Sequence, residues 1–336
     1  MAFFSSFGLT SAGDAGTTFF IVGDYGVVTN LTQAIQVFDA IDEVVGQAEP
    51  KSISDAEFFV TVGDNIYPEL EDAPTDEEFA EMVGLFNGPN IANLPVWAIR
   101  GNHDAYFDWT DELVLSMEQK QWMLPSLWYS KLVPSGKDGE LLGLLFVDSV
   151  LMVCSNYTSF NVSAVGAHDS EMKKLLAKIV CTDQLVEWGN TQYDFIKMTM
   201  QEWASNDKII WRASIQHYPV WFLNLDETAY APINDVYLPL LRQYNFDLYL
   251  NGHEHLIAYA YLDNSTPLSN NYPRNLQSSE NCASGIEYFF NDTSHSRVTK
   301  FRQGEALHQI TTGCTGKVDY PICYDRQQNL ATFTYA

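Results

Sequence analysis

Four of the seven histidines in this 336-residue chain lie in three short strings whose side chains are typical metal ligands. Two Gly-Asp turns, at Asp24 and Asp64, come earlier in the chain, and Tyr67 follows the second turn closely. Carboxylate, amide, imidazole and phenol groups are together sufficient for two metal ions, and paired metal ions are typical of phosphoester hydrolysis. The three strings are Gly101-Asn102-His103-Asp104, Ser214-Ile215-Gln216-His217 and Gly252-His253-Glu254-His255.

The spacing within these strings favours ligands over ordinary turn residues. A glycine before Asp24 or Asp64 permits a tight turn that projects the carboxylate, although a single such Asp is as typical of a self-capped turn. Alternate residues of an extended chain face the same way, so we expect His253 and His255 to address one metal pair, with Glu254 pointing away. A surface His-x-His pair without a metal is the alternative.

Tyr67 indicates which metal is present. A phenol, whose usual pKa is about 10, binds a metal well only as phenolate. At acid pH, a hard trivalent cation must displace the proton, which favours Fe(III) in one position. A core tyrosine beside a turn is the alternative interpretation.

Apolar β-branched runs alternate with helical periodicity, which predicts an α/β fold. A helix is expected over Thr32–Val45 with Ile35, Phe38, Ile41 and Val45 on its buried face, and Thr75 to Glu78 form a capping box. The ligand strings follow the predicted strands, so we expect the site at the carboxyl ends of the strands. Strands are expected at 18–22, 58–62, 96–99, 141–147, 209–215 and 248–250, with closing strands at 307–311 and 331–335.

Composition limits the classes of partner. The net charge of −25 and the pI near 4.4 argue against binding to nucleic acid or to an anionic membrane surface. No apolar run approaches the roughly 18 residues of a membrane span, so we expect a soluble protein. We expect one domain over residues 18–336, with a polar surface insertion at 263–306.

The sequence carries weak signals of secretion. The five cysteines lack the CxxC spacing of zinc or redox sites. An excess of N-glycosylation sequons favours a secreted, extracellular or lysosome-like glycoprotein, although Met1 to Thr10 is not a complete signal peptide. The sequons lie at Asn30, Asn156, Asn161, Asn264 and Asn291.

The motifs GDxG, GDxxY, GNHD, xxxH and GHxH resemble those of the purple acid phosphatases of the calcineurin-like metallophosphoesterase superfamily, in particular the tartrate-resistant type. The resemblance covers about residues 18 to 262 and implies a four-layer α/β/β/α sandwich. It also implies a binuclear centre of Fe(III) with Fe(II) or Zn(II). By position in the motifs, Fe(III) would be held by Asp24, Tyr67 and His255, the second metal by Asn102, His217 and His253, and both by Asp64.

The implied activity is that of an acid phosphatase, which hydrolyses phosphate monoesters by attack of a metal-bound hydroxide. His103 matches a histidine beside the substrate phosphate, and Asp104 is expected to orient an imidazole. A further family histidine near the leaving group is replaced here by Asp226. An ionised carboxylate there would repel the substrate, which predicts weaker turnover or a shifted pH optimum.

Two other functions stay open. One is a structural or assembly-forming glycoprotein that retains a metal-loaded phosphatase fold with weak or no turnover. The other is a dimanganese or dizinc phosphodiesterase, against which Tyr67 argues. The C-terminal sheet is expected to be shorter than in the family, and an unpaired edge there would favour a homo-oligomer.

Overall fold

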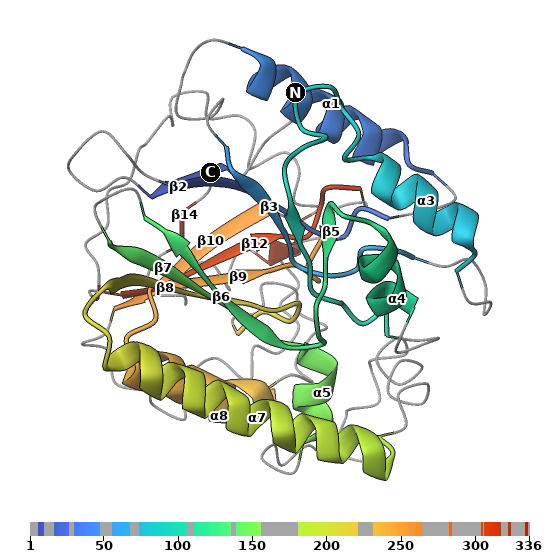
Figure 1. The fold of residues 1–336 in the computed structure, drawn as a ribbon. Coiled ribbons are helices and arrows are strands. Elements are labelled where there is room, and N and C mark those ends of the chain that lie inside the picture. Colours follow the sequence, from blue (N-terminus) through green and yellow to red (C-terminus); the bar gives the residue numbers. More distant parts are fainter. Residues whose placement is uncertain are drawn as a thin grey trace.

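Two β-sheets form the centre of the molecule, with helices on both outer sides (Figure 1). The structure is a computed structural model, and no described helix is long and apolar enough to cross a membrane. It describes residues 6–9, 17–26, 30–47, 56–67, 74–105, 111–135, 139–155, 181–220, 231–255, 257–263, 282–283, 304, 306–316, 322–323 and 333–334.

The smaller sheet has the strand order β1-β2-β3-β4-β5. β1 is antiparallel to β2, and the other neighbours are parallel, so β2, β3 and β4 end at the same edge. The strands are β1 (Ser6–Leu9), β2 (Thr17–Val22), β3 (Phe58–Thr61), β4 (Val96–Trp97) and β5 (Trp122–Met123).

The larger sheet has the order β14-β10-β12-β9-β8-β7-β6. Its central strands, from β7 to β12, are parallel, while β6, β10 and β14 are antiparallel to their neighbours. A separate pair, β11 (Cys282–Ala283) with β13 (Ile322–Cys323), sets Cys282 opposite Cys323. The strands of the larger sheet are β6 (Tyr129–Pro134), β7 (Leu141–Phe146), β8 (Ile209–Ile215), β9 (Leu248–Asn251), β10 (Ile257–Asp263), β12 (Ala306–Thr312) and β14 (Phe333–Thr334).

Helices cover the outer face of each sheet, which gives the four layers that the family resemblance implied (Figure 1). α1 and α3 lie on the side of the smaller sheet, and α5, α7 and α8 lie on the side of the larger one. The helices are α1 (Thr32–Gly46), α3 (Asp76–Gly84), α4 (Asp111–Glu118), α5 (Ser149–Cys154), α7 (Asp183–Ala204) and α8 (Ala231–Gln243).

Apolar side chains of β7 divide between two cores. Leu142, Leu144 and Phe146 belong to the cluster that also contains the smaller sheet and α1, whereas Leu145 belongs to the cluster with α5 and α7. This alternation follows from the two-residue period of a strand. Burying one Phe or Leu side chain stabilises the folded state by about 2 kcal/mol. The first core therefore holds the two sheets together, and the second holds α5 and α7 on the larger sheet.

The capping box at the start of α3 is confirmed. Thr75 Oγ1 accepts a hydrogen bond from the Glu78 backbone nitrogen, and Glu78 Oε2 accepts one from the Thr75 nitrogen. The predicted helix over Thr32–Val45 is confirmed as α1, but two of its four expected core residues are not buried, since Val45 is only partly buried and Ile35 is exposed. Phe38 and Ile41 are buried, whereas 45% of Ile35 is exposed because it faces a groove beside α3.

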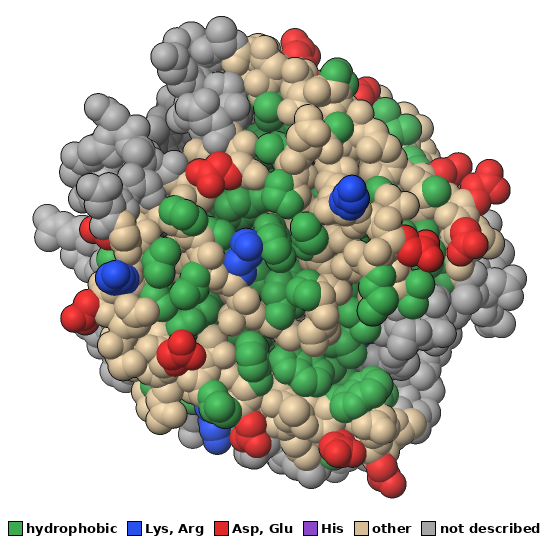
Figure 2. Space-filling model, in the orientation of Figure 1, with side chains coloured by type: hydrophobic (Ala, Val, Ile, Leu, Met, Phe, Trp, Pro, Cys, Tyr) green, Lys and Arg blue, Asp and Glu red, His purple; other side chains and the backbone are tan. Residues whose placement is uncertain are grey.

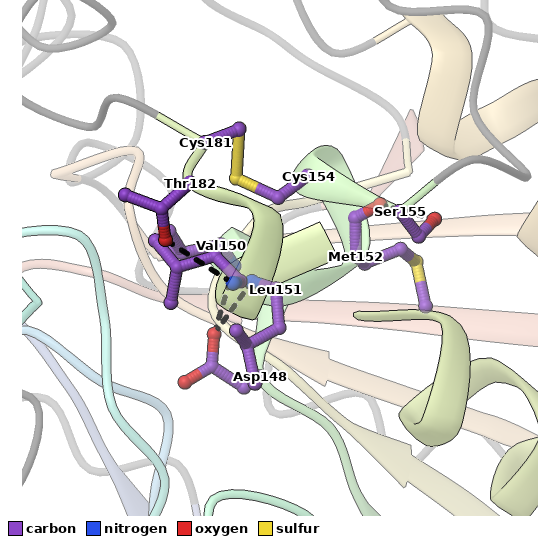
Figure 3. The surroundings of a disulfide bond; sticks show 9 residues. Asp148, Val150, Leu151, Met152, Cys154, Ser155, Cys181 and Thr182 are labelled. Atoms are coloured by element: carbon purple, nitrogen blue, oxygen red, sulfur yellow. Dashed lines mark hydrogen bonds between the residues drawn. A yellow bond between two sulfur atoms is a disulfide. The ribbon is translucent and has the colours of Figure 1, made fainter. Parts of the chain in front are cut away.

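A disulfide between Cys154 and Cys181 joins the end of α5 to the start of α7 (Figure 3). Asp148 caps α5 by accepting hydrogen bonds from the nitrogens of Val150 and Leu151, and Thr182 caps α7. Closing a loop of 27 residues removes about 3.5 kcal/mol of chain entropy from the unfolded state. The sequence did not predict this pairing.

His308 predicts a pH dependence of stability. It lies in β12 at the end of the sheet opposite the ligand strings, and burial lowers its pKa from 6.5 to about 4. Between these values the unfolded chain binds a proton that the folded protein does not, so stability is full above pH 6.5 and falls as the pH decreases. The loss at pH 5 should be on the order of 2 kcal/mol.

We therefore expect His308→Gln to lose less unfolding free energy between pH 7.5 and pH 5 than the unsubstituted protein does. Urea denaturation of both proteins at the two pH values measures this difference, whatever the effect of the substitution at pH 7.5. An identical decrease in both proteins would contradict the assignment.

Candidate metal centre

The ligand strings converge where strands of both sheets end. Asp24 follows β2, Asp64 follows β3, and Asn102 follows the short strand β4. His217 follows β8, and His253 and His255 follow β9 in the larger sheet. The site therefore lies at the carboxyl ends of parallel strands, where loops meet on a rigid support.

Asp24, Tyr67 and His255 form the first group of donor atoms. The Tyr67 hydroxyl donates a hydrogen bond to Asp24 Oδ1 at 2.9 Å and lies 3.2 Å from His255 Nε2. His255 Nε2 is 3.5 Å from the same carboxylate oxygen, and all three residues are buried. A phenol, a carboxylate and an imidazole thus face one point.

Asn102, His217 and His253 form the second group. His217 Nε2 lies 3.0 Å from Asn102 Oδ1 and 3.2 Å from His253 Nδ1. Asp64 Oδ1 is 3.3 Å from the same His217 nitrogen. Ligand atoms of Asp64, His217 and His253 all lie within 4.8 Å of one another, which makes them a metal-binding candidate.

Asp64 contacts both groups. It approaches His217 in the second group, and it is also near enough to Tyr67 in the first group for its negative charge to raise the pKa of the phenol. Its carboxylate is held by the backbone nitrogen of His103, which donates a hydrogen bond to Asp64 Oδ1 at 2.9 Å. One carboxylate thus stands between the two sets of donors.

The donor set fits a cation. His217 Nδ1 donates to the Val62 carbonyl oxygen at 2.8 Å, so that Nε2 faces Asp64 and Asn102. Such an outer hydrogen bond orients a metal-binding imidazole. Burial lowers the pKa of His217, but Asp64 outweighs it and raises the pKa to about 9, so the metal-free ring holds a proton there. A metal ion would replace that proton.

Two further pKa shifts reflect the same concentration of charge. Burial would raise the pKa of Asp64, yet His217, His103 and His253 bring it well below its usual value. Burial, then Asp24 and Asp64, raise the pKa of the Tyr67 phenol well above 10. Tyr67 can therefore become a phenolate only if a strongly charged cation binds beside it.

The backbone is left-handed at three of the ligand candidates. The φ angles are 56° at Asp24, 50° at Asp64 and 70° at His253, a region that costs a residue with a side chain about 1 kcal/mol or more. The expected extended backbone at His253 is therefore wrong. The bend instead directs His253 to the second group and leaves His255 in the first.

Asp104 fastens two of the ligand loops together. Its carboxylate accepts hydrogen bonds from the backbone nitrogens of Gly101, Asn65 and Ile66 at 2.7 to 3.1 Å. The sequence predicted that it would orient an imidazole, whereas these contacts are with backbone amides. Burial and the neighbouring Asp64 raise the pKa of Asp104 to about 7. His103 is half-buried, with its ring 4.3 Å from the Tyr67 ring.

Two supporting residues were missed by the sequence analysis. The Asn65 side chain donates to Glu112, to the Ile99 carbonyl oxygen and to Asp104, and accepts from the Tyr25 hydroxyl. Glu112 is buried, and its pKa is raised by burial and by Asp104. In the sequence, Asn65 is identifiable only as the residue after the second Gly-Asp turn, and Glu112 belongs to no motif.

A loop after β12 also supports the site. The nitrogens of Thr315 and Gly316 donate to the carbonyl oxygens of Gly23 and Asp24 at 3.3 and 3.1 Å. A side chain at Gly316 would overlap the Tyr25 backbone, and one at Gly313 would overlap Glu254. The Gly-x-x-Gly spacing of this loop is the signal that could have identified it.

Of the predicted glycosylation sites, only Asn30 lies in the described part of the chain. Asn30 is exposed, as a glycosylation site requires. Asp226 and the sequons at Asn156, Asn161, Asn264 and Asn291 lie outside the described residues. Most of the predicted insertion at 263–306 does as well, so its assignment stays a prediction.

Gly101 provides a test of the packing around Asp64. A methyl group at Gly101 would overlap both Asp64 Oδ1 and the Asp64 nitrogen, so Gly101→Ala must displace the carboxylate. Changing a group that orients a metal ligand typically lowers metal affinity by about 10- to 100-fold, and displacing Asp64, a proposed ligand, should lower it by at least as much. We expect this loss in metal titrations, while Gly84→Ala, where nothing lies within 4 Å, should retain the metal. Equal metal content in the two variants would contradict the packing argument.

Comparison with known proteins agrees with this geometry. Tartrate-resistant acid phosphatase type 5 from Rattus norvegicus is 25% identical over 250 residues, which cover 73% of this chain and 68% of that protein. Purple acid phosphatase 17 from Arabidopsis thaliana is 23% identical over 261 residues, which cover 76% and 67%. The resemblance found in the motifs is thus confirmed.

Among solved structures, GAP50, described as the anchor in the inner membrane complex of Plasmodium, shares the fold with a TM-score of 0.56 at 12% identity. The match covers 91% of this chain and 76% of the other, and it concerns the fold alone. The sequence profile of the family described as calcineurin-like phosphoesterase matches residues 17–256, a span that includes both groups of donor atoms. Because this span is most of the chain, the protein belongs to the calcineurin-like phosphoesterase family.

Proposed function

We propose that the protein is a binuclear acid phosphatase that hydrolyses phosphate monoesters. The observation that carries the proposal is the position of Asp64 between two groups of donor atoms. Membership of a phosphoesterase family and the similarity to purple acid phosphatases support the same reaction class. The substrate is accordingly a phosphate ester.

The two groups define the proposed ligand sets. Asp24, Tyr67 and His255 would hold Fe(III), and Asn102, His217 and His253 would hold Fe(II) or Zn(II), with Asp64 shared. The phenol of Tyr67 supports a trivalent ion in the first set, since burial and two carboxylates otherwise keep its proton in place. The neutral amide of Asn102 suits the second set, where another carboxylate would cancel the charge that attracts a phosphate.

When bound, the two ions would withdraw electron density from the phosphoryl group and make a water molecule at the site more acidic. The chain itself contributes positioning and proton transfer. His103, half-buried against Tyr67, is the proposed donor of a hydrogen bond or proton to the substrate phosphate. Asp104 would keep His103 in place by fixing the turn in which both residues lie. We retain Asp226 as the proposed group near the leaving group.

The decisive experiment combines an assay with metal analysis of the same sample. Hydrolysis of p-nitrophenyl phosphate at pH 5 by protein that contains about two metal ions per chain would support the proposal. His217→Gln should lose activity and part of the metal. Protein that binds no metal when iron and zinc are supplied would overturn the proposal.

Tyr67 gives a spectroscopic prediction. We expect the iron-loaded protein to show a visible charge-transfer band from phenolate to Fe(III), and Tyr67→Phe to abolish it. Tyr25 is the matched control, because it is buried beside the site but its hydroxyl donates to Asn65. Absorption spectra of Tyr67→Phe and Tyr25→Phe measure the difference. Retention of the band in Tyr67→Phe would exclude Tyr67 as the ligand.

Two alternatives are distinguished by the same samples. A metal-replete protein without turnover would favour a structural or assembly-forming role, which is consistent with a shared fold in a protein described as an anchor. A colourless manganese or zinc protein that prefers bis(p-nitrophenyl) phosphate would favour a phosphodiesterase.

The remaining assignments are also proposals. The exposed Asn30 supports a secreted or lysosome-like glycoprotein, and the negative net charge argues against nucleic-acid and membrane partners. We retain residues 18–336 as a single domain. Assembly through the edge of the C-terminal sheet, where β14 now lies, is tested by light scattering at high protein concentration.

A further inference from the structure

A groove of about 540 Å³ lies between α1 and α3, on the outer side of the smaller sheet. Its apolar lining comes from Leu31, Ile35, Phe38 and Leu85. Ile35 is 45% exposed, so a large apolar side chain of α1 meets water here instead of the core. The groove is within the size range of sites that bind ligands or anchor side chains, about 300 to 1,000 Å³.

The base of the groove is rigid. Phe38 is 2% exposed and packs edge-on against Phe86, with 4.6 Å between ring centroids. It also contacts Tyr25 and Phe59, which belong to the core of the smaller sheet. A bound segment would therefore meet a preformed surface, and binding would not lose the conformational entropy of ordering Phe38.

The rim of the groove is acidic. Asp39 from α1 and Glu81 from α3 both line it, and neither has a cationic partner in the described part of the chain. The spans of α1 and α3 contain seven carboxylates and no lysine or arginine. Figure 2 shows acidic side chains along the margin of the molecule over α3. Before Arg100 the sequence has sixteen acidic residues and one basic residue, Lys51.

From these features we propose that the groove between α1 and α3 binds a short, basic, amphipathic segment of a partner polypeptide. An apolar side chain of that segment would enter between Ile35 and Leu85, and flanking lysines or arginines would face Asp39 and Glu81. This is the helix-in-groove mode of recognition, with charge giving the orientation. An acidic segment or an anionic membrane is repelled by the same rim. The proposal does not depend on the phosphatase activity.

Gly84 allows a sharp test, because it lines the groove and a side chain there would meet nothing within 4 Å. Gly84→Phe should fill the groove, while Gly84→Ala should leave it open and slightly strengthen the helix. The double variant Asp39→Lys with Glu81→Lys reverses the charge of the rim. Circular dichroism and metal content should be unchanged in all three, which separates lost binding from lost folding.

The probe is a fluorescent helical peptide of about four turns, with leucines on one face and lysines elsewhere. Fluorescence anisotropy should show binding to the unsubstituted protein and to Gly84→Ala, and a Kd about tenfold or more higher for Gly84→Phe and for the charge-reversed variant. The same peptide with glutamates for lysines should not bind. Equal binding to Gly84→Ala and Gly84→Phe, or no binding to the unsubstituted protein, would overturn the proposal.

Discussion

The centre of this molecule depends on the requirement that seven polar side chains be held close together in a buried site, so that a cation can bind them. Carboxylate, phenol, amide and imidazole groups converge here within hydrogen-bond distance, and all but His253 are buried. The Asp104 carboxylate meets this requirement by binding backbone amides of both the Asp64 loop and the Gly101 loop. The positions of Asp64 and Asn102 therefore depend on how these two loops are held together.

That bracing extends outward through a second set of buried charges. Arg100, next to the Gly101 loop, forms an ion pair with Asp148, and both side chains are only 1% exposed. Asp148 caps α5, and Ser149 at the start of that helix accepts hydrogen bonds from the backbone of His217 and Tyr218. The β4 loop and the β8 loop, which come from different sheets, are thus joined through one short helix. Removing one partner of such a buried pair is typically costly.

Most of the fold and the chemical type of the site could be predicted from sequence, because strand runs and motif residues are local patterns. The position of Ile35 could not, since its exposure depends on where α3 packs. The bend at His253 was also missed, because left-handed backbone is uncommon even at His, where it is enriched, and surrounding contacts impose it. Glu112 was missed because its hydrogen bond with Asn65 joins residues 47 apart, and a contact between residues so distant in sequence leaves no local pattern.

The Cys154–Cys181 bond fixes how far apart its two ends lie. The covalent link holds the Cα atoms of the two cysteines 5.4 Å apart, whatever the chain between them does. Insertions or deletions between the two cysteines would therefore leave the ends of α5 and α7 together. The bond thus gives α5, the helix that supports His217, a covalent tie to α7 in addition to its packing.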